Sequence, residues 1–172
     1  MRSLKKLISL FFCIALAGCA RAPGAFVVQA AALQGDTLIV RSRWQPDTPV
    51  LDALDHGIGL PFVVSLRARG SGMPVARIQR HVQLRYFPLS RQYQLRDAED
   101  GTVRNYAARG QAIAAMENLR LTGFERAGAE QFQVRIRLDR DALPGALRLP
   151  ALLHAAWRMD SGDYAWHDSR SG

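Results

Sequence analysis

The feature that most restricts the fold of this chain is the alternation of apolar and polar residues in several short segments. In the clearest one, 131–139, single glutamine, arginine and aspartate residues separate Phe132, Val134, Ile136 and Leu138. A period of two places the apolar side chains on one face of a β-strand and the polar side chains on the other. Such strands must bury their apolar face against a second layer of structure, so the chain is expected to fold around sheets.

The same alternation occurs in three earlier segments, 37–44, 62–69 and 78–86. Further short strands are expected at 26–33, 92–96, 102–106 and 164–166. Turn-forming residues lie between these segments, at 34–36, 70–72, 88–90 and 97–101. Short strands joined by tight turns predict an antiparallel meander with one apolar face and one arginine-rich face.

Two segments have the spacing of helices. Val50, Leu51 and Leu54 predict a short helix that is capped by Asp47 or Thr48 and stopped by Gly57. The segment "RGQAIAAMENLRL" predicts a second, amphipathic helix, because Ala112, Ile113, Met116 and Leu119 or Arg120 lie three or four residues apart. The segment 146–153 fits either a strand or a turn of helix.

Together these patterns predict a mainly β fold, an antiparallel sandwich or a curved meander sheet, with two short helices. An α+β fold is the alternative. The length of 172 residues and the absence of repeats indicate one domain, placed at 26–168, with 169–172 as a tail.

The first eighteen residues have the layout of a secretory signal peptide. A basic start at Arg2, Lys5 and Lys6 precedes an apolar run that is too short to span a membrane as a helix. The run ends in Leu16-Ala17-Gly18-Cys19, which resembles the lipobox of bacterial lipoproteins. The resemblance implies cleavage before Cys19 and acylation of Cys19, with residues 19–25 as a linker.

A lipidated Cys19 implies a protein that is anchored by acyl chains and faces the periplasm. Multiple acyl chains make membrane attachment lasting. Ala20 follows the cysteine where an aspartate favours inner-membrane retention in enterobacterial lipoproteins, so the outer membrane is favoured. The linker spans at most about 23 Å, which keeps the domain close to its membrane.

The charge of the chain is strongly positive, at +8. Every lysine or arginine outside the leader is arginine, which a GC-rich genome explains more readily than a binding function does. The functional alternative is an anion-binding face on the sheet, because guanidinium groups pair with phosphates and carboxylates. Its candidate residues are Arg67, Arg69, Arg85, Arg135 and Arg137. Nucleic acid is not expected as a partner of an exported protein.

No catalytic or metal-binding motif is recognised in the sequence. The histidines are scattered, and the best candidate for a cation site is Asp52, Asp55 and His56, which an ordinary helix end explains better. The acidic residues Asp97, Glu99 and Asp100 are interpreted as a solvated turn. The chain is therefore expected to be non-enzymatic and to bind no cofactor and no metal.

Two further motifs carry a resemblance to a family. The segment "YFPLSRQYQL" contains Tyr86, Leu89, Arg91, Gln92 and Tyr93, and the ending "WRMDSGDYAWH" contains Trp157, Asp160, Ser161, Gly162, Tyr164 and Trp166. With "LPFVVSLRAR" they resemble a family of exported proteobacterial proteins, catalogued as a domain of unknown function and sometimes labelled proline-rich signal peptide protein. The resemblance covers roughly Phe26 to His167. Many members have a tryptophan-rich insertion where this chain has only "RGSGMP".

The resemblance implies export and one mostly β domain, and it supplies no activity. The expected function is a non-enzymatic interaction or structural module of the cell envelope with an unknown envelope protein as partner. The alternatives are a module that binds anionic lipid or cell-wall polymer through the arginine face, and a periplasmic accessory to a membrane signalling protein, since family genes lie near a membrane histidine kinase pair.

Two local expectations accompany this reading. Arg91 is expected to pack its stem on Tyr93 and to bond turn carbonyls or an acid such as Asp97. Trp157 is expected to meet Tyr164 or Trp166 across strands, either as a packed corner or as a platform for a partner or a sugar.

Overall fold

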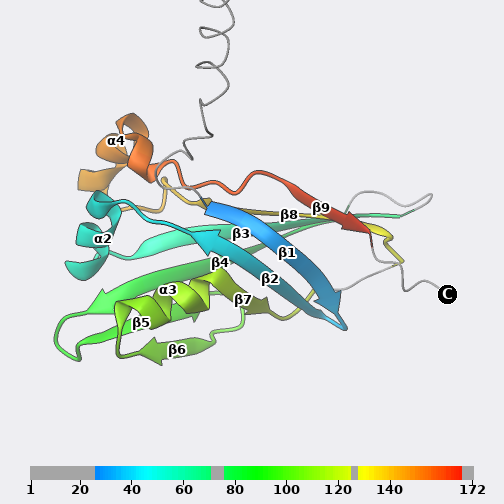
Figure 1. Cartoon of the computed structure of the whole chain (residues 1–172), viewed down its shortest axis with the longest axis horizontal. Helices are drawn as coiled ribbons and strands as arrows, with labels where there is room; N and C mark the ends of the chain where they lie inside the picture. The colour runs from blue at the N-terminus through cyan, green and yellow to red at the C-terminus, as the bar shows by residue number, and fades with distance from the viewer. Residues whose placement is uncertain (1–25, 71–75, 125–127, 168–172) are drawn as a thin grey trace, which may run out of the picture.

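The computed structural model describes residues 26–70, 76–124 and 128–167. The leader 1–18, Cys19 with its linker, most of the turn at 70–72 and the tail 169–172 lie outside the described residues. Two antiparallel sheets pack face to face in the described part (Figure 1). None of its helices is long and apolar enough to cross a membrane.

The smaller sheet has three strands in the order β1-β2-β7. Their bounds are Phe26–Gln34 for β1, Thr37–Trp44 for β2 and Asn118–Leu121 for β7. β1 and β2 form the expected hairpin, in which Gln34 pairs with Thr37 and Gly35 takes a φ of 61°. A two-residue hairpin turn requires this left-handed backbone, which glycine adopts without a steric penalty.

The larger sheet has six strands in the order β6-β5-β4-β3-β8-β9. Four of them form the expected meander, namely β3 (Leu60–Arg69), β4 (Ala76–Phe87), β5 (Gln92–Asp97) and β6 (Val103–Tyr106). The other two, β8 (Gln131–Leu138) and β9 (Tyr164–His167), add to the free edge of β3. The mainly β fold is confirmed, in its sandwich form.

The core lies between the two sheets, where the apolar side of every long strand points inward. Phe26 and Trp44 of the small sheet meet Phe62 of the large sheet, with ring centroids 6.0 and 5.4 Å apart. Such aromatic pairs contribute about 0.5–1.5 kcal/mol beyond the burial of their area. Within the described residues this core extends from Phe26 to Trp166, and the chain from Ala20 onward contains all of it.

The described residues form three α-helices, so the expectation of two was one too few. The helices are α2 (Thr48–Asp55), α3 (Arg109–Glu117) and α4 (Gly145–Leu153), and a short 3₁₀ turn, η1 (Ala155–Trp157), follows α4. The ambiguous segment 146–153 is helical, because Leu147 and Ala151, one turn apart, both reach the core.

The second expected helix ends earlier than 120. α3 stops at Glu117, and Leu119 and Leu121 continue as β7, buried opposite Val40 and Leu38 of β2. A Glu117 carboxylate oxygen accepts the backbone N–H of Trp44 at 2.8 Å. Pairing with β2 therefore decides the conformation of this segment over its helical spacing.

Candidate anion-binding face

The side of the large sheet that points away from the core, here called the outer face, carries all five predicted arginines. The register shows this, since Arg67 pairs with Gln133 and both alternate with buried residues. Arg135 and Arg137 lie farther along β8 on the same side, and Arg69 lies two residues beyond Arg67. The face also carries Arg77 and Arg96, which the sequence interpretation did not single out.

The five arginines do not form one site. Arg85 lies eight residues along β4 from Arg77, and Arg77 pairs with Arg67. At the rise per residue of a β-strand, eight residues correspond to about 26 Å. The Nε of Arg85 donates to the carbonyl of Gly57 at 3.0 Å, and its guanidinium lies over the ring of Phe87. Arg85 is thus engaged at the end of the sheet that carries α2.

Arg135 is held by an acid. Its Nε and one terminal nitrogen donate to the two carboxylate oxygens of Asp160 at 2.8 and 2.6 Å, and Asp163 lies 3.9 Å away. These hydrogen bonds, with the attraction of the same charge, lower the pKa of Asp160 below its usual range despite partial burial. The charge of Arg135 is therefore compensated within the fold.

The motif around Asp160 fixes the chain to β8. Ser161 forms two hydrogen bonds with the backbone of Ile136. Its backbone N–H donates to the Ile136 carbonyl at 2.8 Å, and its Oγ accepts the Ile136 N–H at 2.9 Å. Gly162 has a φ of 65°, and its N–H donates to Asp160. The segment 160–162, which is part of the family resemblance, therefore has a structural role in the described residues, because it holds the chain against β8.

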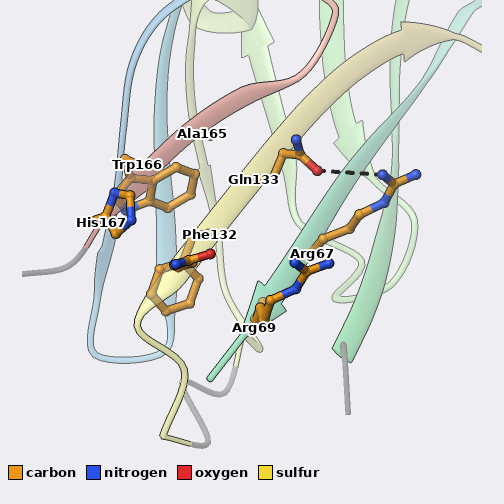
Figure 2. Close-up of a pocket in the computed structure, with 9 residues that line it drawn as sticks. Arg67, Arg69, Phe132, Gln133, Ala165, Trp166 and His167 are labelled. Atoms are coloured by element: carbon orange, nitrogen blue, oxygen red, sulfur yellow. Dashed lines mark hydrogen bonds between the residues drawn. The ribbon is translucent and has the colours of Figure 1, made fainter. Parts of the chain in front are cut away.

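A hollow of about 410 Å³ opens where β3, β8 and β9 end together. Its floor and walls come from all three strands, as Figure 2 shows: β8 runs between Arg67 and Arg69 on one side and Trp166 and His167 on the other. Hollows of this size are typical of small-ligand sites. We call it the β9 hollow.

The β9 hollow contains two guanidinium groups and no carboxylate among the residues that line it. One terminal nitrogen of Arg67 donates to the side-chain oxygen of Gln133 at 3.5 Å, which is longer than a usual N–H···O bond. Neither Arg67 nor Arg69 has an ion pair within the described ranges, although Glu130 lies beside Arg69 in an adjoining shallow hollow. Both cations are therefore available to an outside anion.

Two aromatic residues on the strands of the β9 hollow, Phe132 and Trp166, pair across β8 and β9 and direct their rings to the core side of the sheet. Trp166 stacks on Phe132 with centroids 5.4 Å apart, and its indole N–H is buried without a partner in the described part of the chain. The sequence interpretation missed Gln133, Phe132 and His167 here. A signal was present, because Gln133 belongs to the same alternation that identified Arg135 and Arg137.

The predicted contact of Trp157 with the other tail aromatics is not formed. Trp157 lies in η1, not in a strand, and packs near Ala53 of α2 as part of the core. Tyr164 and Trp166 lie near each other on β9, at 6.4 Å. The aromatic residues separate because α4 and η1 carry Trp157 to one end of the sheet while β9 runs toward the other.

The expectation for Arg91 is also wrong. Arg91 lies in the turn before β5 with a φ of 51°, its side chain is exposed, and Asp97 is paired elsewhere. Tyr93 does face inward as expected. Its ring lies 4.6 Å from that of Tyr86 in a tilted arrangement, and its hydroxyl donates to Asp55 at 2.7 Å. Arg109 of α3 forms an ion pair with the same carboxylate.

The acidic turn at 97–100 is more than a solvated loop. Arg80, on the inner face of β4, lies 3.2 Å from Asp97 and 3.5 Å from Asp100, and its guanidinium approaches the ring of Phe124. Burial raises the pKa of Asp97, which Arg80 opposes. Glu99 accepts the backbone N–H of His81 at 2.8 Å.

The described residues contain no group of three or more His, Cys, Asp or Glu side chains that is arranged to hold a metal ion. In the candidate cluster of α2, His56 instead contacts the carbonyl of Asp52 at 2.6 Å. Asp55 is occupied by Tyr93 and Arg109.

Comparison with known proteins identifies a family for this chain. A family model described as Domain of unknown function (DUF4390) matches residues 29–167, which is most of the sequence. No curated protein and no solved structure matches the chain. The match covers both sheets and the β9 hollow, and the chain therefore belongs to the DUF4390 family.

Proposed function

We propose that this chain is a lipid-anchored protein of the bacterial cell envelope whose domain is a non-enzymatic binding module. Its ligand carries carboxylate or phosphate groups, and it binds at the β9 hollow. The observation that carries the proposal is the pair Arg67 and Arg69, which line this hollow without an acidic partner in the described structure.

Two other arginines of the outer face have partners within the fold. Arg135 is neutralised by Asp160, and Arg85 bonds a carbonyl and covers a ring. Arg67 and Arg69 line the hollow and have no ion pair in the described structure. Their guanidinium groups can instead bind the oxygen pairs of a carboxylate or phosphate bidentately.

Binding to simple anions tests the proposal directly. The chain from Ala20 onward is titrated with inorganic tripolyphosphate and, separately, with a hexaglutamate peptide, by calorimetry at low and high salt. The double variant Arg67→Gln/Arg69→Gln is expected to lose at least about tenfold in affinity for the probe that binds, and binding should weaken with salt. The two probes distinguish a phosphate ligand from a carboxylate ligand.

A matched control is the double variant Arg77→Gln/Arg96→Gln, which removes the same charge from the same face but not from the hollow. An equal loss of affinity in both double variants would show that binding depends on the net charge of the face and not on the hollow. Absence of binding of either probe to the unmodified chain would contradict the anion-binding role.

The lipid anchor is tested in cells. Metabolic labelling with a palmitate analogue should mark the full chain and should fail for Cys19→Ser. Label that persists in Cys19→Ser would show that Cys19 is not the site of lipid attachment. Sucrose-gradient fractionation of the labelled protein then separates inner from outer membrane, with the outer membrane expected.

A further inference from the structure

Helix α4 presents an apolar face to solvent. Leu149, Leu152 and Leu153 are 64, 51 and 70% exposed. They lie at positions i, i+3 and i+4, which fall on one side of a helix. Leu147 and Ala151 hold the opposite side against the core, so the helix is fixed with its leucines outward. Grouped exposed leucines mark an interaction surface, whereas scattered ones would not.

A basic hollow of about 460 Å³ adjoins this face. Leu152 forms part of its wall together with Arg137, Arg140 and Arg158. Asp141 and Asp160 also line it, but both carboxylate oxygens of Asp160 are bonded to Arg135. Within the described residues no ion pair joins Arg137, Arg140 or Arg158 to an acid. The surface thus combines three leucines with three arginines that form no ion pair within 4 Å in the described structure, although Asp160 lies close enough to attract Arg137.

The chain enters the domain at this same end. Phe26, the first described residue, lies 5.8 Å from Trp44 in ring centroids, and the indole N–H of Trp44 donates to the sulfur of Met159, just after η1. Figure 1 shows the start of β1 beside α4, at the opposite end of the sandwich from the tip of the β1–β2 hairpin. A linker that reaches about 23 Å at most would keep this end nearest to an acyl group on Cys19.

We propose that α4 lies against the surface of a bilayer that contains anionic lipid. The three leucines enter the boundary between headgroups and acyl chains. The arginines of the adjoining hollow, Arg137, Arg140 and Arg158, bind lipid phosphates. The orientation of the domain relative to the membrane rests on the proposed anchor at Cys19. The lipid-binding surface itself rests on the leucines of α4 and on the arginines of the adjoining hollow.

The chemistry favours a membrane over a protein partner. A short helix with leucines on one side and arginines at its border is the pattern of interfacial membrane helices. Each arginine near an anionic surface adds favourable electrostatic energy that salt weakens. Membrane contact at the anchored end would also leave the β9 hollow, at the far end of the sheet, directed away from the bilayer.

Vesicle sedimentation tests the surface with the chain from Ala20 onward, which lacks leader and lipid. Vesicles of phosphatidylethanolamine with phosphatidylglycerol are compared with phosphatidylcholine vesicles. We expect binding to the anionic vesicles only. Leu149→Ser/Leu152→Ser/Leu153→Ser and Arg140→Gln/Arg158→Gln should each weaken it by at least about tenfold. The altered side chains are exposed except for that of Arg140, which is half-buried, and thermal melting confirms that each variant folds.

Two controls separate this surface from the β9 hollow. Val103→Ser changes an exposed apolar residue on the edge strand β6, and Arg67→Gln/Arg69→Gln removes two charges from the far end. Both should bind vesicles like the unmodified chain. A loss confined to Arg67→Gln/Arg69→Gln would overturn the α4 surface and assign lipid binding to the hollow.

The remaining outcomes are also decisive. Absence of vesicle binding by the unmodified chain, or equal binding to neutral and anionic vesicles, would overturn the inference. Vesicle binding through α4 without tripolyphosphate or hexaglutamate binding at the hollow would contradict the proposed function and leave this inference standing.

Discussion

On the inner face of the large sheet Arg80 has two carboxylates within 3.5 Å. On the outer face the one side-chain partner of Arg67 among the described residues is the amide of Gln133, at 3.5 Å. The two residues lie on neighbouring strands, β4 and β3. The side chain of Arg80 is 11% exposed and that of Asp97 8%, so water solvates either charge only slightly. Arg67 is only partly buried at the edge of an open hollow.

The comparison shows how burial separates structural from functional arginine. A buried charge must be compensated by a nearby opposite charge, because its desolvation costs several kcal/mol. An arginine that faces water has no such requirement. Its lack of a partner leaves its charge available to a ligand. The four predictions below test this distinction.

The largest effect is expected for Asp97→Ala on the inner face. Removing one partner of a buried pair typically costs about 3–5 kcal/mol, and Asp100 still compensates part of the charge of Arg80, so about 3 kcal/mol is expected. Urea unfolding of the chain from Ala20 onward measures this loss. Arg67→Gln on the outer face should change stability by no more than about 0.5 kcal/mol. Similar losses in both variants would remove the distinction between the faces.

Tyr93→Phe removes the hydrogen bond to Asp55 on the inner face and should cost about 1.5–2 kcal/mol at neutral pH. Burial, and after it the hydrogen bond to Asp55, raises the pKa of Tyr93 from 10.0 to about 12. The folded state therefore holds this proton more tightly than the unfolded chain. The contribution is complete below pH 10 and is lost as the pH rises through 12.

Unfolding curves at pH 7 and at successive values from 10 to 12 measure the difference between Tyr93→Phe and the unmodified chain. The difference should shrink toward zero over that range. Tyr86→Phe is the matched control, because its ring lies in the same cross-strand pair. A difference for Tyr93→Phe that is independent of pH would show that the phenol proton has no part in stability.

Asp160→Asn tests the one compensated arginine of the outer face. The pair with Arg135 is partly exposed, so the loss at neutral pH should be about 0.5–1 kcal/mol. The hydrogen bonds from Arg135 lower the pKa of Asp160 in the folded state, so its contribution is present above about pH 4 and is lost as the pH falls below that value. Stability measured at pH 7 and pH 3 should show the two proteins converging at the lower pH. A larger loss than for Asp97→Ala would reverse the ranking of the faces.

The smallest effect is expected for Arg91→Ala, because the side chain is exposed in a turn. Its stability should stay within about 0.5 kcal/mol of the unmodified chain. Arg91→Gly should stabilise the protein by about 0.5–1 kcal/mol, since a φ of 51° strains every residue except glycine. Thermal melting distinguishes these cases. Destabilisation by both variants would point to a contact of the guanidinium group that the described structure lacks.

The sequence alone predicted the arginine face because a period of two has a direct geometric meaning. Once Val134 and Ile136 are buried, Arg135 and Arg137 must lie on the opposite side of the strand. It could not predict which arginines remain unpaired. Asp160 reaches Arg135 from a turn twenty-five residues later, and that approach depends on how α4 and η1 return the chain to β8.

Local patterns thus determined most of the strands, the β1–β2 hairpin and the first helix, because alternation and turn residues act over a few neighbouring residues. The first helix begins after Asp47 as expected, although the Asp47 side chain makes no capping hydrogen bond. Tertiary structure decided the rest. Pairing with β2 converted the end of the second predicted helix into β7, and packing of Leu147 and Ala151 made the ambiguous segment α4. The free edge of β3 brought β8 and β9 beside Arg67 and Arg69 to form the hollow. These choices depend on contacts between residues far apart in the chain, whose energies exceed the weak preferences of a short segment.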